Sequence, residues 1–452
     1  MTTVKREIEL IGKKIQTRRI PSNIENMIKQ ISISNYKSVV NTTFPLTTFN
    51  VIIGANGCGK SNILEAIALA AAANADKLDY EYFANRGIRV VDPRFMLPAF
   101  EDIEAEEIQI QLEIDSHEPL FFKIRYNKEA KPPRWEEDGE FFQKLDKEIQ
   151  DQRTELLGWF ESLSQQKEIS PKTKQELIHR INNLEKRLND LQQKNSVKKI
   201  EFFDKMKEIR PLDASQITLL DEDLRPSYLR VIYEVLNGFV IYSLEESVLR
   251  KPGDDKRLYP LGRHGEGLFA HLKDLSGREN GINILREINE NLEILDWFDG
   301  MVVPENQLSQ DFDVKLRDRY IDETISYFDQ RSTNEGFLYL LFYLTLIISD
   351  ETPSFFAIEN IDASFNPKLC REVVRRLTEL AKKHGKQIIA TTHNPSVLDG
   401  LDVGADDQEL LVVRRNIDGY TKVNKVEMKG KLSMSLSEAW LKGLLGGLPN
   451  NF

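Results

Sequence analysis

The sequence predicts an α/β fold: a mixed sheet with flanking helices and an antiparallel hairpin, opened by an inserted helical arm. A buried strand near residue 52 leads through a glycine-rich turn into an alanine-rich helix. A second block of alternating apolar strands and helices begins near residue 333. Alternation of strand and helix is typical of a parallel sheet covered by helices, so two distant blocks are expected to share one sheet.

The first block begins after an irregular, locally basic segment, residues 1–25. Ile31 and Ile33 indicate one strand, and the short apolar run 51–53 indicates a second, of the kind buried in a parallel sheet. Residues 62–75 are rich in alanine and predict a helix. Strand, glycine-rich turn and helix is the order that a phosphate-binding loop requires.

The middle of the chain changes its apolar period. Residues 107–126 alternate apolar and polar, which predicts an antiparallel hairpin. From residue 141 the apolar positions step by three and four, and they do so again over residues 177–191. The pattern predicts an antiparallel coiled-coil hairpin, with two amphipathic helices packed on a body as the alternative. Residues 201–330 are expected to be mostly helical.

The second block predicts helices over 337–348 and 367–384 and strands at 355–358, 388–390 and 410–413. Near the end of the chain, Ser435 and Glu438 have capping-box spacing and predict a short helix within 435–445.

Composition limits the class of protein. The chain has 452 residues, and 61 Lys and Arg against 72 Asp and Glu give a net charge of −11. No apolar stretch approaches the ~20 residues of a membrane span, and two cysteines cannot build a disulfide scaffold. A cytoplasmic protein with no membrane partner is expected. DNA binding is possible through a local basic patch, but the net charge does not favour it.

Eight consecutive residues fit the phosphate-loop pattern G-x-x-x-x-G-K-[ST]. They are Gly54, Ala55, Asn56, Gly57, Cys58, Gly59, Lys60 and Ser61. In such a loop backbone N–H groups face the phosphates, Lys60 reaches the β- and γ-phosphates, and the Ser61 hydroxyl binds Mg²⁺. The sequence therefore predicts a nucleotide site at this loop.

The surroundings of the loop resemble one branch of the ABC-type ATPases. The loop continues into Asn62, and Asn35-Tyr36-Lys37-Ser38 lies on the preceding strand. Both features resemble the RecF, SMC and OLD ATPases. The resemblance implies that ATP is the ligand and that Lys37 lies near the phosphates; a solvated lysine in a turn is the alternative.

The second block continues the resemblance. Residues 354–367 resemble the family's Walker B strand and D-loop, and residues 391–395 resemble its switch-histidine loop. The resemblance implies that Glu359 binds Mg²⁺ with Ser61, that Asn360 and His393 are catalytic, and that Asp362 belongs to the D-loop. Ser332 and Gly336 would be the signature that contacts ATP on a second protomer; an N-cap and turn is the alternative.

Two positions depart from the family pattern. Glu359 stands where Asp is usual, and Asn360 stands where the family has the Glu that orients the attacking water. An amide can position water but cannot accept its proton, so slow or partner-dependent hydrolysis is expected.

The resemblance divides the chain into one ATPase head with inserted segments. These are an extension (1–25), the first half of the head (26–135), a coiled-coil hairpin (136–200), a mostly helical insertion (201–330), the second half of the head (331–430) and a tail helix (431–452).

The function implied is that of an ATPase that forms a dimer or higher oligomer around ATP and regulates a separate effector protein. ATPase subunits of anti-phage systems have this organisation. The alternatives are a RecF-like clamp on DNA and a nucleotide-gated scaffold that does not hydrolyse ATP.

Overall fold

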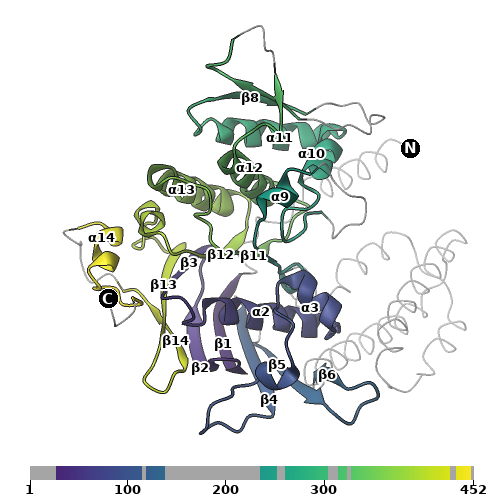
Figure 1. Cartoon of the computed structure of the whole chain (residues 1–452), viewed down its shortest axis with the longest axis vertical. Helices are drawn as coiled ribbons and strands as arrows, with labels where there is room; N and C mark the ends of the chain where they lie inside the picture. The colour runs from purple at the N-terminus through teal and green to yellow at the C-terminus, as the bar shows by residue number, and fades with distance from the viewer. Residues whose placement is uncertain are drawn as a thin grey trace, which may run out of the picture. The chain divides into compact units, whose positions relative to one another are not determined.

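The structure is a computed structural model of the chain. It describes residues 27–114, 119–137, 235–251, 260–303, 314–322, 327–427 and 434–448. All of these residues belong to one compact unit (Figure 1). The predicted extension 1–25 lies outside the described residues. So does the predicted coiled-coil hairpin 136–200, apart from residues 136–137, which end a strand.

A six-stranded mixed sheet forms the centre of this unit, with the strand order β14-β13-β3-β12-β11-β7. Five of the strands are parallel and β14 is antiparallel to β13. Their bounds are β3 (Phe49–Ile53), β7 (Ile241–Tyr242), β11 (Phe355–Ile358), β12 (Gln387–Thr391), β13 (Gln408–Arg415) and β14 (Thr421–Lys425). Since β3 lies between β12 and β13, the prediction that two distant blocks share one sheet is confirmed.

A second, antiparallel sheet has the order β2-β1-β4-β5-β6. Its strands are β1 (Ile28–Tyr36), β2 (Val39–Pro45), β4 (Glu107–Ile114), β5 (Leu120–Asn127) and β6 (Arg134–Glu137). The predicted hairpin is the β4–β5 pair, in which Ile108 faces Ile124 and Ile110 faces Phe122. Alternate residues of β4 are buried, as the sequence alternation predicts.

Helix α2 (Lys60–Asn74) lies between the two sheets, where it contacts β1, β4 and β5 on one side and β7 on the other (Figure 1). All its residues except Ser61 and Asn62 are buried. The run of alanines suits this position, because small side chains let both sheets approach one helix. Helix α3 (Tyr80–Arg86) and the short helix η2 (Pro93–Phe95) follow it.

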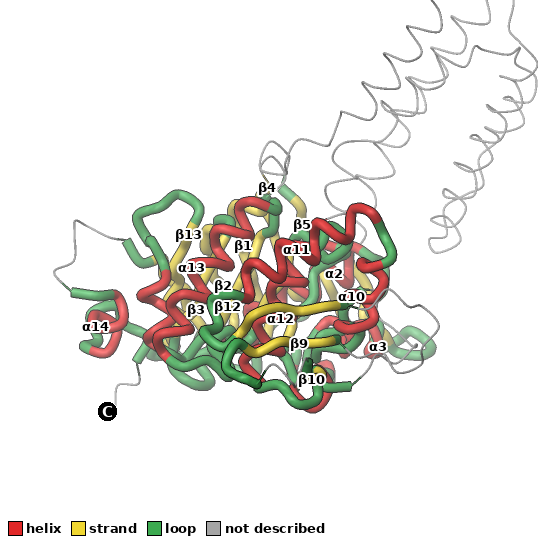
Figure 2. Tube along the Cα trace, turned by 90° about the horizontal axis from the view of Figure 1, so that it is seen from above, coloured by secondary structure: helices red, strands yellow, loops and turns green. Residues whose placement is uncertain are grey.

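Helices α12 (Glu335–Ile348) and α13 (Pro367–Lys383) cover the other face of the central sheet. Seen from above, α11, α12 and α13 lie side by side over the strands (Figure 2). Helix α12 is buried from Phe337 to its last residue, whereas α13 buries one face and exposes the other. Asn334 and Asn366 cap the two helices by accepting backbone N–H groups.

The segment 201–330 contains strands that its sequence did not predict. Its described residues include helices α9 (Glu246–Leu249), α10 (Leu268–Ser276) and α11 (Glu279–Leu292). They also include a three-stranded antiparallel sheet of β8 (Phe298–Val302), β9 (Lys315–Asp318) and β10 (Phe328–Asp329). Strand β7 of this segment completes the central sheet beside β11.

The described C-terminal part ends in η3 (Pro395–Gly400), the β13–β14 hairpin and α14 (Leu436–Leu441). The Ser435 hydroxyl accepts the N–H of Glu438 at 3.2 Å, so the predicted N-cap is confirmed. Among the helices of the described ranges, none combines the length and the apolar composition that a bilayer span requires.

Candidate nucleotide site

The glycine-rich loop joins β3 to α2 at the carboxyl edge of the parallel strands, where α/β sheets bind ligands. Two of its glycines are required by close contacts. A Cβ on Gly54 would lie 2.3 Å from the carbonyl oxygen of Val413, and one on Gly59 would lie 2.1 Å from Oγ1 of Thr421. Thr421 also donates its hydroxyl to the Cys58 carbonyl at 2.8 Å. The β13–β14 hairpin therefore packs directly against the phosphate loop.

Lys60 folds back onto the loop that precedes it. Its Nζ donates to the carbonyl oxygens of Gly54 at 2.7 Å and Ala55 at 3.1 Å. Burial lowers the pKa of the Lys60 ammonium group, and the nearby Glu359 carboxylate opposes that shift. The Lys60 cation is thus bound by two neutral carbonyl oxygens, and an anionic ligand at the loop would bind it more strongly than they do.

Ser61 and Glu359 meet across the two halves of the chain. The Ser61 hydroxyl donates to Oε1 of Glu359 at 2.7 Å. The backbone N–H of Glu359 donates to the Tyr242 carbonyl of β7 at 2.8 Å, which fixes the end of β11. Hydroxyl and carboxylate oxygens are the ligands that Mg²⁺ prefers, so these two residues fit a magnesium ion.

The residues after Glu359 contact the loop that contains His393. Asn360 is exposed, has a left-handed backbone (φ 52°), and donates its N–H to Oγ1 of Thr391 at 3.1 Å. The Thr392 hydroxyl donates to Asp362 at 2.6 Å. Partial desolvation of the ring, followed by the charge of Lys60, lowers the pKa of His393, while Asp362 opposes the shift. His393 is therefore mostly neutral at pH 7.

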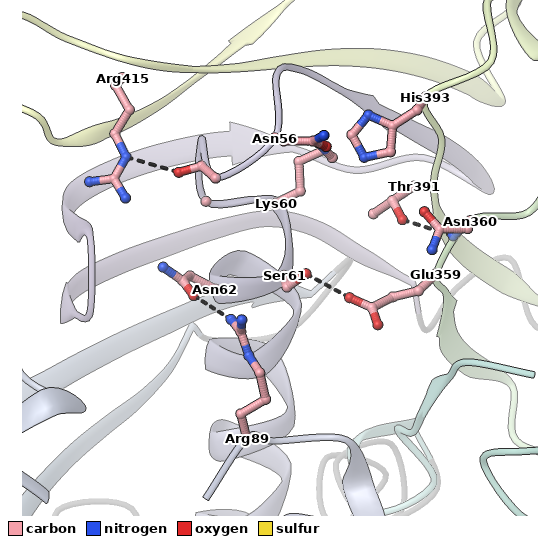
Figure 3. A pocket seen from close by; sticks show the side chains of 12 residues that line it. Asn56, Lys60, Ser61, Asn62, Arg89, Glu359, Asn360, Thr391, His393 and Arg415 are labelled. Carbon is pink, nitrogen blue, oxygen red and sulfur yellow. Dashed lines mark hydrogen bonds between the residues drawn. The ribbon is translucent and has the colours of Figure 1, made fainter. Parts of the chain in front are cut away.

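These side chains converge on a cavity of about 420 Å³ (Figure 3). Its lining comprises Asn56, Gly57, Gly59, Lys60, Ser61, Asn62, Arg89, Glu359, Asn360, Thr391, His393 and Arg415. Nine of the predicted site residues are in this set. Gly54, Ala55 and Cys58 form the back of the loop and do not line the cavity.

A family model matches residues 49–399, more than three quarters of the chain, and spans every element of this pocket up to His393. Its description is "AAA domain, putative AbiEii toxin, Type IV TA system". The chain belongs to this family of AAA-domain ATPases. The phosphate loop on a parallel strand agrees with this match and identifies a P-loop ATPase of the AAA class.

Solved structures with a similar fold include three SMC heads. One is a Smc head bound to the C-winged helix domain of ScpA, with 15% identity and TM-score 0.49, covering 89% of this chain and 98% of that one. A second, from Pyrococcus furiosus, has 14% identity and TM-score 0.44, and the match covers 92% of this chain and 99% of that one. The SMC head from Thermotoga maritima has 13% identity and TM-score 0.39, covering 89% and 99%. No curated protein matches the chain.

Lys37 lies beside the pocket of this AAA-domain ATPase and does not line it. It forms an ion pair with Glu65, whose side chain is only 2% exposed. Glu65 also pairs with Arg89 and accepts the hydroxyl of Tyr36 at 3.0 Å. Burial lowers the pKa of Lys37, and Glu65 opposes that shift. One buried carboxylate thus holds two cations at the edge of the site.

Three lining residues were not predicted as nucleotide ligands: Arg89, Thr391 and Arg415. Arg89 donates to Oδ1 of Asn62 at 2.8 Å, and Arg415 donates to the Gly57 carbonyl at 3.2 Å. Arg415 ends a buried parallel strand beside the phosphate loop, which is a usable sequence signal. Arg89 belongs to no motif, so only the fold brings it here.

The predicted signature lies away from this cavity. Ser332 is exposed and its hydroxyl donates to Asp329 at 2.9 Å, while Asn334 and not Ser332 caps α12. A Cβ on Gly336 would lie 3.0 Å from the Ser364 carbonyl, so Gly336 packs closely on the segment that follows Asp362. A role for Ser332 and Gly336 on a second protomer stays a prediction.

Proposed function

We propose that this chain binds ATP with Mg²⁺, hydrolyses it slowly, forms a dimer or higher oligomer around it, and regulates a separate effector protein in bacterial anti-phage defence. The observation that carries the proposal is the pocket in which Lys60, Ser61 and Glu359 meet. A lysine cation, a hydroxyl and a carboxylate in one pocket are the groups that bind a nucleoside triphosphate and its metal ion.

In this proposal the metal ion neutralises charge on the β- and γ-phosphates when it is bound. Ser61 and Glu359 would hold it, and Lys60 would exchange the carbonyls of Gly54 and Ala55 for phosphate oxygens. Neutral His393 faces the same cavity and can donate a hydrogen bond to an oxygen of the terminal phosphate.

Slow turnover follows from Asn360. Its exposed amide can orient a water molecule but cannot take up a proton. The left-handed backbone at this position is one that asparagine tolerates better than most residues. Complete absence of hydrolysis is therefore a second candidate, and it would make the chain a nucleotide-gated scaffold. A measured turnover number for the purified protein separates the two.

Assembly around ATP is supported by the position of the predicted signature. Ser332 is exposed and therefore available to a second protomer, whereas Gly336 is half-buried against the segment that follows Asp362. We expect ATP to increase the mass of the protein in solution, and Ser332→Arg to prevent the increase. Asn280→Arg, on the exposed start of α11, is the matched control and should leave assembly intact.

The proposed effector and defence role rest on the family description, which names a toxin and a type IV TA system. A regulator of this kind must bind its effector in a nucleotide-dependent way. Co-purification of the neighbouring gene product with the chain, with and without ATP, tests this. Equal recovery in both conditions, or no recovery in either, would contradict the proposal.

A further inference from the structure

The C-terminal tail, defined as residues 434–448, contacts the phosphate loop and η3, the short helix that follows His393. It includes α14 and a glycine-rich stretch after it. Three of its glycines, Gly443, Gly446 and Gly447, have φ between 75° and 78°. This left-handed backbone lets the tail turn sharply after α14, at positions where other residues would be strained.

The first contact is with the phosphate loop. A Cβ on Gly447 would lie 3.4 Å from the Cα of Gly54 and 2.8 Å from Cγ1 of Val412. Gly54 is the residue whose carbonyl accepts the Lys60 ammonium group at 2.7 Å. A side chain at Gly447 would therefore be too close to Val412 and would contact Gly54, the residue that accepts the phosphate-binding lysine.

The second contact is with the segment after His393. Asp399 of η3 accepts the backbone N–H of Ser437 at 3.0 Å and its hydroxyl at 2.6 Å. Trp440 is buried and packs into the same core cluster as residues of η3. Asn394, next to His393, caps η3 by accepting the N–H of Ser396 at 3.0 Å. The tail is thus anchored to η3, which begins two residues after His393.

We propose that the tail is a positioning element that holds the phosphate loop and the His393 segment in their ligand-binding arrangement. Its docking and the occupation of the pocket are then linked, and the inference rests on the proposed binding of ATP. Linkage is reciprocal: if docking strengthens ATP binding by some factor, ATP must strengthen docking by the same factor. A tail with only a structural role would change the stability of the fold, but ATP would not change how strongly the tail docks.

Two glycines of the tail provide a matched pair of variants. Gly443 and Gly447 have nearly the same φ, 76° and 78°, so a leucine suffers the same backbone strain at either position. A Cβ at Gly443 meets nothing within 4 Å, whereas one at Gly447 meets Val412 and Gly54. Any difference between Gly443→Leu and Gly447→Leu therefore reports the contacts of Gly447 with the end of β13 and with the phosphate loop.

The test is the affinity of the full chain for ATP with Mg²⁺, measured by calorimetry on folded protein whose melting temperature has been checked. We expect Gly447→Leu to raise the dissociation constant at least about tenfold, and Gly443→Leu to change it by less than about twofold. Equal effects of the two variants would overturn the inference. A wild-type chain that does not bind ATP would contradict the proposed function instead.

Hydrogen exchange supplies the reciprocal measurement and a readout if Gly447→Leu fails to fold. ATP should slow amide exchange in the wild-type tail, and Ser437→Ala, which removes one hydrogen bond to Asp399, should reduce that protection. Lys442→Ala is the control, because its exposed ammonium group pairs with Glu438 within α14 and leaves the bonds between Ser437 and Asp399 intact. Exchange in the tail that ATP leaves unchanged would overturn the inference.

Discussion

Ser61 and Glu359 are 298 residues apart in sequence, and the hydroxyl of one donates to the carboxylate of the other at 2.7 Å. Ser61 is the second residue of α2 and Glu359 follows β11, so the pair joins the two blocks of the chain at the edge of their common sheet (Figure 3). The proposed magnesium site therefore exists only when both blocks have folded together.

Glu359→Gln should remove the magnesium dependence of ATP binding. The amide retains an oxygen that can accept the Ser61 hydroxyl, but it loses the charge that a divalent cation requires. We expect Mg²⁺ to tighten ATP binding at least about tenfold in the wild type and less than about twofold in the variant, as measured by titration with and without chelator. Glu372→Gln, on the outer face of α13, is the control. A variant with the wild-type response to Mg²⁺ would exclude Glu359 as a ligand.

Asn360→Glu should raise ATP turnover if the missing base limits hydrolysis. The backbone at this position has φ 52°, so glutamate should also cost about 1 kcal/mol of stability. Asn360→Gly relieves the strain and removes the amide, and it should lower turnover without loss of stability. Steady-state hydrolysis and thermal unfolding of all three proteins check this. Equal turnover in wild type and Asn360→Glu would indicate a different limiting step.

Glu65→Ala should destabilise the protein by about 3 kcal/mol, because it leaves the buried Tyr36 hydroxyl and the Lys37 ammonium group without their shared carboxylate. Glu438→Ala breaks the exposed pair with Lys442 and should cost less than about 0.5 kcal/mol. Denaturant unfolding of both variants measures the difference. A loss below about 1 kcal/mol for Glu65→Ala would show that the cluster contributes little to stability.

The stability of the protein should rise between pH 7.5 and 9.5 because of Lys386. Burial lowers its pKa from 10.5 to about 8, and its Nζ donates to carbonyls of Ser349, Thr352 and Pro353. Between these two pKa values the unfolded chain binds more protons than the folded one, so raising the pH favours folding.

Lys386→Met removes this titration. Relative to the variant, the wild type should gain about 2 kcal/mol of unfolding free energy over that pH interval. Parallel pH profiles of the two proteins in urea would contradict the assignment.

The elements that the sequence predicted well are those whose pattern is long or buried on all sides. The apolar run of β3 and the seventeen residues of α13 are examples. Strands β7 and β10 have two residues each, and β9 has four, so none is long enough to establish a period. These strands are formed by tertiary pairing, which a single sequence does not reveal.

The residues of the site also divide into those that a sequence motif identifies and those that only the fold brings together. Lys60, Ser61, Glu359 and His393 belong to motifs and could be placed in one pocket before the fold was known. Arg89 enters through its ion pair with the buried Glu65, and Gly447 reaches Gly54 from the far end of the chain. Neither contact has a local signature, because each depends on how distant segments pack.

The central claim is that ATP binds in the pocket formed by the phosphate loop and the end of β11. Calorimetric titration of the full chain with ATP and Mg²⁺, compared with Lys60→Met, tests it most directly. We predict one site per chain in the wild type and at least a hundredfold weaker binding in the variant, with both proteins folded by thermal unfolding. Equal binding by the two proteins, or no binding by the wild type, would contradict it.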